Sequence, residues 1–212
     1  MNKSDILSRI RAEKVVALIR ADDTGSLIEC VHALSKGGLS CIELTMTTPG
    51  ALHLCATITR ELPHTLVGMG TVLSADVARH AVASGAKFIV TPAVLPDVVE
   101  TCRDAGVPVL GGALTPTEIY NSWKLGVDVV KIFPAEFFGP AYLRSIKAPF
   151  PGIDLMPTGG VTPETIGDFL KNGAFATAAG SSLVLPALLK ARDWPAITAR
   201  AQAFVAAAHR PV

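Results

Sequence analysis

Short apolar runs alternate with longer amphipathic stretches along the whole chain. Short runs, here about three to seven residues long and rich in Val, Ile and Leu, are typical of strands covered on both faces. The stretches between them carry apolar residues at helical spacing. Strands are expected at 15–20, 41–45, 66–70, 88–91, 109–111, 127–133, 154–157 and 175–179.

Capping residues indicate where the helices begin. A first helix is expected over Ser4–Glu13, ahead of the first strand, and the last helices are expected to run to Ala208. Ser26–Glu29 and Thr115–Glu118 each match a capping box, in which Ser or Thr and a Glu three residues later bond to the backbone. Ser74 is expected to cap the helix after the third strand.

Eight strand–helix units within 212 residues predict a single-domain (β/α)8 TIM barrel of the α/β class over residues 1–212, with an extra N-terminal helix. An open doubly wound sheet is the alternative, and such a fold binds a dinucleotide after its first strand. No G-x-G-x-x-G motif follows the first apolar run. The pattern therefore favours the barrel.

Composition and charge exclude several classes of protein. Half of the residues are hydrophobic and 17% are charged, which indicates a globular chain. The net charge is +1, and Lys and Arg do not cluster, so no nucleic-acid partner is expected. The N-terminal stretch lacks the apolar core of a signal peptide, and no apolar run is long enough to span a bilayer, so no membrane partner is expected either.

Cysteine and histidine spacing gives no sign of a metal site. The four cysteines lie far apart in sequence and are interpreted as reduced core thiols of a cytoplasmic protein. The five histidines show no ligand spacing. We therefore expect no metal.

One lysine interrupts the sixth apolar strand. Alternation along a strand places Lys131 on the same face as Val129 and Phe133. A buried lysine is more readily deprotonated than a solvated one, and a neutral amine can attack a ketone to form a Schiff base. The alternative is a stem that lies along the strand while its ammonium reaches water.

An acidic residue interrupts the second strand in the same way. Glu43 lies between Ile42 and Leu44, so it either pairs with an inward cation or serves as a general acid–base beside Lys131. In barrels of this class the site lies at the C-terminal ends of the strands. The other polar residues expected there are Arg20, Thr45, Thr71, Thr91, Thr158 and Ser181.

Two glycine turns follow the last two strands, Gly159-Gly160 after the seventh and Gly180-Ser181 after the eighth. Glycine lets backbone N–H groups approach an anion, and a helix beginning after Ser181 would add its positive end. Both turns could simply reverse the chain. Their position after strands seven and eight, the usual phosphate site of this fold, favours phosphate.

Several segments resemble the 2-keto-3-deoxy-6-phosphogluconate (KDPG) aldolase family, which includes 4-hydroxy-2-oxoglutarate and phosphogalactonate-specific aldolases. The resemblance extends from the first strand to the eighth. Its segments are Glu43-Leu44-Thr45, Gly68-Met69-Gly70-Thr71-Val72-Leu73, Val90-Thr91-Pro92, Lys131-Ile132-Phe133-Pro134-Ala135-Glu136 and Pro157-Thr158-Gly159-Gly160-Val161.

The resemblance implies a class I aldolase that needs no metal or organic cofactor and assembles as a homotrimer. Lys131 matches the Schiff-base lysine and Glu43 the general acid–base carboxylate. Residues matching the phosphate-binding turns are Gly159, Gly160, Gly180 and Ser181.

The same resemblance assigns a pocket for the pyruvate part of the substrate, lined by Thr71 and Thr158. Thr45, Pro92 and Phe133 are expected in that pocket as well. Several members carry an arginine four residues after the glutamate, and here that position is Thr47. Arg20 matches an arginine of other members and is expected to bind the substrate carboxylate.

The resulting hypothesis is cleavage of KDPG, a phosphorylated keto acid, to pyruvate and glyceraldehyde 3-phosphate. The phosphogalactonate epimer and 4-hydroxy-2-oxoglutarate are alternative substrates, and Phe138-Gly139-Pro140 also occurs in the phosphogalactonate type. Rival functions are a sugar-phosphate isomerase or epimerase, which would form no trappable adduct, and a non-catalytic sugar-phosphate binding barrel.

Overall fold

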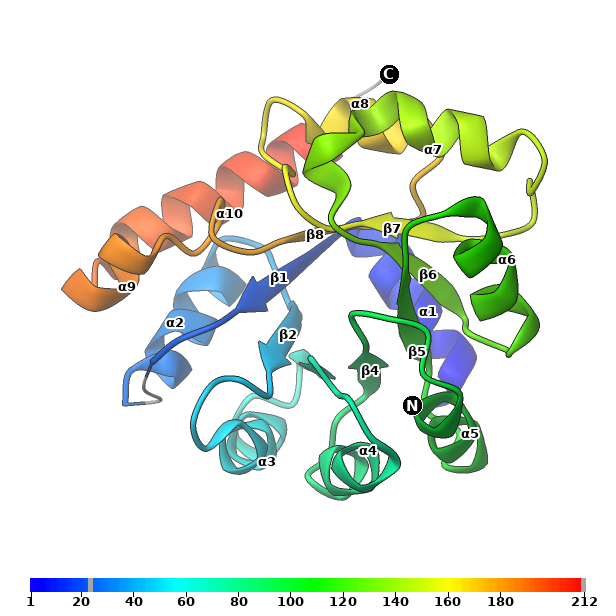
Figure 1. Ribbon diagram of the computed structural model, residues 1–212. Coiled ribbons are helices and arrows are strands. Elements are labelled where there is room, and N and C mark those ends of the chain that lie inside the picture. The colour runs from blue at the N-terminus through cyan, green and yellow to red at the C-terminus, as the bar shows by residue number, and fades with distance from the viewer. Residues whose placement is uncertain (23–24, 211–212) are drawn as a thin grey trace.

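The chain folds into a barrel of parallel strands surrounded by helices (Figure 1). The computed structural model describes residues 1–22 and 25–210. The strands are β1 (Val15–Ile19), β2 (Cys41–Thr45), β3 (Leu66–Gly70), β4 (Phe88–Val90), β5 (Val109–Ala113), β6 (Val129–Ile132), β7 (Leu155–Pro157) and β8 (Thr177–Ala179). The helices are α1 (Lys3–Glu13), α2 (Leu27–Lys36), α3 (Ala51–Glu61), α4 (Ala75–Ala83), α5 (Pro96–Asp104), α6 (Pro116–Lys124), the 3₁₀ turn η1 (Ala135–Phe137), α7 (Gly139–Lys147), α8 (Ile166–Lys171), α9 (Pro186–Ala191) and α10 (Trp194–Ala208).

Neighbouring strands pair in parallel in the order β7-β6-β5-β4-β3-β2-β1-β8. The two ends of this sheet meet through isolated bridges, Thr158 with Ala178 and Leu155 with Ala174, and through a hydrogen bond from the Phe175 N–H to the Leu155 carbonyl. The strands therefore close into a barrel. The predicted (β/α)8 fold is confirmed, and the open-sheet alternative is wrong.

Alternation along the strands divides the core into an inner and an outer layer. The inner cluster contains Val16, Cys41, Leu66, Phe88, Val90, Leu110, Val129, Met156, Ala176 and Ala178. Ile6 and Ile10 of α1 pack against it, so the extra helix closes the N-terminal end of the barrel. Outward residues such as Ile42 and Val67 pack against the surrounding helices. Apolar side chains thus fill the N-terminal part of the barrel interior and leave polar residues at the C-terminal ends of the strands.

Two of the three predicted helix starts are confirmed. Thr115 forms the capping box with Glu118, and Ser74 accepts a hydrogen bond from the Val77 N–H. The capping box predicted at Ser26 is wrong, because its side chain makes no capping hydrogen bond. Ser26 has ψ 15°, whereas Thr115 has ψ 158°, the extended geometry that directs a cap hydroxyl at the helix N–H groups.

The helix expected to follow Ser181 is present as α9 (Pro186–Ala191), but it does not begin directly after Ser181. Residues 181–184 form turns, in which the Leu183 and Val184 N–H groups both donate to the Gly180 carbonyl. The helix α9 begins only at Pro186. The Gly180-Ser181 turn therefore does not lie at a helix N-terminus.

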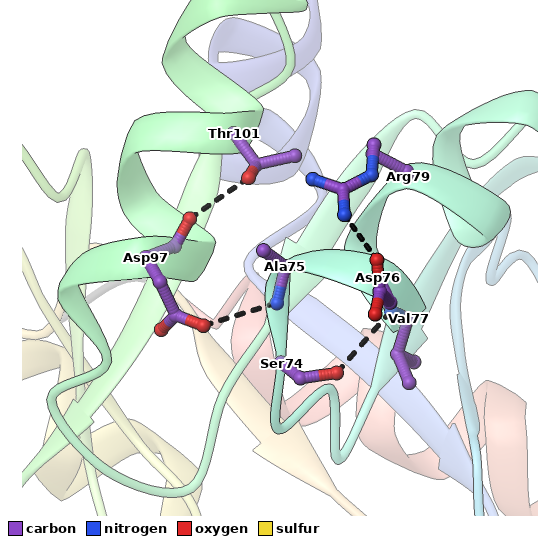
Figure 2. Close-up of polar contacts among 7 residues, drawn as sticks. All are labelled: Ser74, Ala75, Asp76, Val77, Arg79, Asp97 and Thr101. Carbon is purple, nitrogen blue, oxygen red and sulfur yellow. Dashed lines mark hydrogen bonds and ion pairs between the residues drawn. The ribbon is translucent and has the colours of Figure 1, made fainter.

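A polar clamp joins the first turns of α4 and α5 (Figure 2). The Asp97 carboxylate at the start of α5 accepts a hydrogen bond of 3.1 Å from the Ala75 N–H at the start of α4. The Thr101 hydroxyl donates to the Asp97 carbonyl at 2.8 Å, and Arg79 pairs with Asp76 on α4. The clamp fixes the first turn of α4, which follows the loop that begins at Thr71.

No helix among the described residues is both long and apolar enough to cross a membrane.

Candidate active site

Lys131 and Glu43 meet at the polar end of the barrel. Lys131 on β6 and Glu43 on β2 are separated in the sheet by three strands, so their side chains meet across the interior. Lys131 Nζ lies 3.8 Å from Glu43 Oε1, which is ion-pair distance and longer than a hydrogen bond. The side chains are 7% and 0% exposed. The structure therefore brings together the two residues that the sequence singled out.

Burial raises the pKa of the Glu43 carboxyl above its ordinary value, and the charges of Lys131 and Arg20 only partly oppose that effect. Neither carboxylate oxygen of Glu43 has a hydrogen-bond partner among the described residues, and the same holds for Thr158 Oγ1. Buried polar atoms without partners are costly. Three such atoms at one barrel end indicate a place where a polar ligand binds.

Two glycines make room for this arrangement. A Cβ on Gly70 of β3 would lie 2.0 Å from Glu43 Oε1, so only glycine leaves the carboxylate in place. A Cβ on Gly112 of β5 would lie 2.2 Å from the carbonyl carbon of Pro92. The Gly112 N–H donates to the Thr91 hydroxyl at 3.2 Å, which fixes the loop after β4. Glycine inside a strand here marks a close approach of a side chain or of another backbone segment.

Phe133 continues the inward face of β6 beyond Lys131. Its ring is 41% exposed, and its centroid lies 5.3 Å from Lys131 Nζ, within cation–π range. Phe133 precedes Pro134 through a cis peptide bond. Phe133 is therefore an apolar wall beside the amine.

The threonines of the site differ in their surroundings. Thr45 is fully buried, and its hydroxyl lies 2.9 Å from that of Thr47 and 3.4 Å from that of Thr48. Thr71 has φ 58°, a left-handed backbone that is uncommon for a β-branched residue and costly to hold. Thr158 is 5% exposed and pairs with β8 through Ala178. Only the Thr158 hydroxyl is both buried and unpartnered.

The two glycine turns lie side by side. Gly159 and Gly160 have φ of +100° and +69°, and both lie against Glu136 of η1. The Ser182 hydroxyl, next to the Gly180-Ser181 turn, donates to the Val161 carbonyl at 2.6 Å. The Thr165 hydroxyl donates to the Gly160 carbonyl at 2.9 Å. The Ser182 hydrogen bond thus links the two turns predicted to bind phosphate, and the Thr165 hydrogen bond holds the first turn to the segment that leads into α8.

A cavity of about 550 Å³ opens where β1 and β8 end. Leu18 and Arg20 from the β1 side and Gly180 and Ser181 from the β8 side line it. Leu18 is paired with Glu43 in the sheet, so the cavity adjoins the buried pair. Arg20 is also close enough for its charge to lower the pKa of Glu43.

Sequence reasoning did not identify every residue that shapes the site. Gly70 entered only as part of a longer segment, and Gly112 lies just beyond the strand expected at 109–111, so neither close approach was predicted. Lys190 and Arg192, which line the cavity, lie in a helical stretch where a cation is ordinary. Glu136 was known only as part of a longer segment, although its carboxylate lies against Gly159.

Comparison with known proteins places this architecture in a family. The family model described as Aldolase: KDPG and KHG aldolase matches residues 6–200. The 2-dehydro-3-deoxy-phosphogluconate aldolase of Treponema pallidum is 34% identical over 199 residues, covering 93% of each chain.

Two solved structures extend the comparison. KDPG aldolase from Legionella pneumophila, with pyruvate captured as a covalent carbinolamine, superposes with a TM-score of 0.88 at 25% identity and covers 94% of this chain and 97% of its own. The Zymomonas mobilis enzyme with 3-phosphoglycerate has a TM-score of 0.86 at 31% identity and covers 96% of each chain. With the barrel and the buried lysine, these matches show that the chain belongs to the KDPG and KHG aldolase family and is a class I aldolase.

Proposed function

We propose that this enzyme cleaves KDPG to pyruvate and glyceraldehyde 3-phosphate through a Schiff base on Lys131. The observation that carries the proposal is the buried pair, with Lys131 Nζ 3.8 Å from Glu43 Oε1 and both Glu43 oxygens unpartnered. The Treponema pallidum relative is named for the same substrate.

Lys131 must lose a proton before it can attack. Because burial raises the pKa of Glu43, moving that proton to Glu43 costs less than moving it to a solvated carboxylate. The neutral amine adds to the C2 ketone of the substrate, and the carbinolamine loses water to form a protonated imine. Glu43 supplies and removes protons in these steps, directly or through a water.

The imine then accepts the electrons of the breaking bond. Glu43 takes the proton of the C4 hydroxyl, the C3–C4 bond breaks, and its electron pair moves to C3 and toward the imine nitrogen. Glyceraldehyde 3-phosphate leaves as the aldehyde. Protonation of the enamine at C3 and addition of water release pyruvate and the free amine. A carboxyl with a raised pKa is suited to both directions of proton transfer.

We assign the pyruvate end of the substrate to the polar barrel end. The unpartnered Thr158 hydroxyl is a donor for the keto-acid carboxylate, and Thr45, Thr71, Pro92 and Phe133 complete this part of the pocket. The sequence hypothesis assigned Arg20 to the same carboxylate. Arg20 keeps this role in the proposal, because its charge reaches Glu43, and it also lines the cavity that contains Gly180 and Ser181.

The phosphate is assigned to the two linked turns. Left-handed glycines such as Gly159 and Gly160 leave backbone N–H groups accessible to an anion. Gly180 and Ser181 face the cavity together with the Arg20 guanidinium. A six-carbon acid with C2 at Lys131 would then extend toward these turns.

We also propose a homotrimer in the cytoplasm. Neighbouring exposed aromatic side chains on α6 support assembly, since Tyr120 is 40% and Trp123 47% exposed and their ring centroids lie 6.0 Å apart. All four cysteines are free and buried, which suits a reducing compartment. Sedimentation equilibrium would give the oligomeric mass, and a monomer at micromolar concentration would contradict the trimer.

The activity is tested by coupling pyruvate release to lactate dehydrogenase. The panel contains KDPG, its phosphogalactonate epimer and 4-hydroxy-2-oxoglutarate, and the proposal expects the highest kcat/KM for KDPG. A higher value for either alternative would overturn the substrate assignment. Lys131→Ala should abolish turnover of all three, and turnover that survives would overturn the mechanism. Isomerised product without pyruvate would instead support the isomerase class.

A further inference from the structure

The cavity beside the phosphate turns has a wall that the proposed function does not use. This wall is α9 and the residue after it, which contribute Lys190 and Arg192. Figure 1 shows the short helix α9 next to α10 on the side of the barrel where β1 ends. Both cations lie on the segment that follows the Gly180-Ser181 turn.

The described lining of this cavity is strongly basic. It holds three cations, Arg20, Lys190 and Arg192, and one carboxylate, Asp22, a net charge of +2, while the whole chain carries +1. Among the described residues, no ion pair or side-chain hydrogen bond engages any of the three cations. A concave wall with unpaired cations raises the local concentration of anions.

The backbone at Arg192 adds a second observation. Arg192 has φ 53° and ψ 36°, a left-handed conformation that glycine adopts more readily. Its N–H closes α9 by donating to the Leu188 and Leu189 carbonyls. An arginine here costs backbone energy but carries a guanidinium to the cavity wall.

We propose that Lys190 and Arg192 form a cationic rim of the phosphate seat and give the enzyme its selectivity for phosphorylated over unphosphorylated 2-keto-3-deoxy acids. The inference rests on the proposed function. A phosphate at Gly180 and Ser181 meets these cations across the cavity, whereas a neutral terminal hydroxyl gains nothing from them. Both side chains are exposed, so salt should screen their effect.

A purely structural reading makes a different prediction. A cation at the C-terminal end of a helix also stabilises the helix through its dipole. In that role Lys190 and Arg192 would affect folding stability but not the choice of substrate. Lys36, at the C-terminal end of α2, provides a matched control because α2 runs antiparallel to the strands and ends at the opposite end of the barrel. Lys36→Met also removes a positive charge from the C-terminal end of a helix.

The test measures kcat/KM for KDPG and for unphosphorylated 2-keto-3-deoxygluconate, at low and at physiological ionic strength. Lys190→Met and Arg192→Met should each lower kcat/KM for KDPG about tenfold at low salt, through KM. In both variants, kcat/KM for the unphosphorylated acid should change less than about twofold. Lys36→Met should change kcat/KM for KDPG less than about twofold as well. Arg192→Lys should restore most of the loss, and Arg192→Gly should not, although glycine relieves the left-handed backbone.

An equal loss of kcat/KM for both substrates, or no loss of kcat/KM for KDPG, would overturn the proposal of a cationic rim. The binding of inorganic phosphate, measured by calorimetry, separates this failure from failure of the aldolase proposal. If wild type binds phosphate and the rim variants bind it about tenfold more weakly, the rim stands even where no pyruvate is released. If the rim variants bind phosphate as wild type does, the rim is wrong whichever substrate is cleaved.

Discussion

The contact between Gly70 and Glu43 gives the sharpest prediction about the site. A Cβ on Gly70 would lie 2.0 Å from Oε1, 2.6 Å from Cδ and 2.8 Å from Cγ of Glu43. Ordinary van der Waals contact begins at 3.4 Å, so Gly70→Ala requires the carboxylate to retreat by about 1.4 Å. Glu43 is fully buried, so the carboxylate has to move inside the barrel, where it faces Lys131.

Two consequences of this displacement differ in size. Overpacking a buried site costs about 1–3 kcal/mol of folding stability. A catalytic group misplaced by about 1 Å can lower a rate about 100-fold. We therefore expect Gly70→Ala to remain folded at 25 °C, with a free energy of unfolding lower by about 2 kcal/mol and a kcat lower by about 100-fold.

The assay combines urea unfolding with single-turnover formation of the pyruvate adduct and steady-state cleavage. Gly167→Ala is the matched control. Gly167 lies in α8, and a Cβ there would have no neighbouring segment within 4 Å. It should keep wild-type kcat and gain up to about 1 kcal/mol of stability.

A double-mutant cycle identifies the cause of the loss. If Gly70 acts through Glu43, adding Gly70→Ala to Glu43→Gln should lower kcat little further. A folded Gly70→Ala enzyme with kcat within twofold of wild type would refute the reasoning, and so would fully additive losses in the cycle.

Three further predictions follow from single contacts. The acid limb of the pH profile of kcat/KM should show an apparent pKa above 4.5, the ordinary value for Glu43, and Glu43→Gln should remove that limb. Because the folded protein binds this proton more tightly than the unfolded chain, the stability that Glu43 contributes should fall as the pH rises from about 4.5 through the raised pKa. A rise in stability over this pH range would contradict the burial argument. Ser182→Ala should raise KM for KDPG about fivefold with kcat unchanged, since the hydroxyl links the two turns, whereas Ser145→Ala on exposed α7 should leave KM unchanged. Asp97→Ala should lower the urea-unfolding free energy by about 1 kcal/mol, and Asp76→Ala, which breaks only an exposed pair, by less than about 0.5 kcal/mol.

The fold was predictable because short apolar strand runs and stretches with helical spacing alternate along the whole chain. Alternation in each strand gave the inward face of β6 and β2, which is why Lys131 and Glu43 could be expected to meet. The helix caps were less predictable than the strands. Ser26 carries the capping pattern, but its ψ of 15° is not extended, and its side chain makes no capping hydrogen bond.

The rest of the site depends on contacts between segments distant in sequence. Nothing near Gly70 in the sequence shows that Glu43 lies against it, and the pairing of β2 with β3 decides that contact. Arg192 belongs to a helical pattern, and its left-handed backbone becomes visible only with the end of α9. Such close approaches and left-handed residues require tertiary structure to identify.

Reductive trapping with pyruvate shows directly whether Lys131 forms the Schiff base. The protein is incubated with pyruvate, treated with borohydride and digested, and the modified peptide is identified by mass spectrometry. A Schiff base on Lys131 predicts one reduced pyruvate adduct, on Lys131, that is absent in Lys131→Ala. An unmodified Lys131 in folded protein, or an adduct on another lysine, would contradict the Schiff-base mechanism.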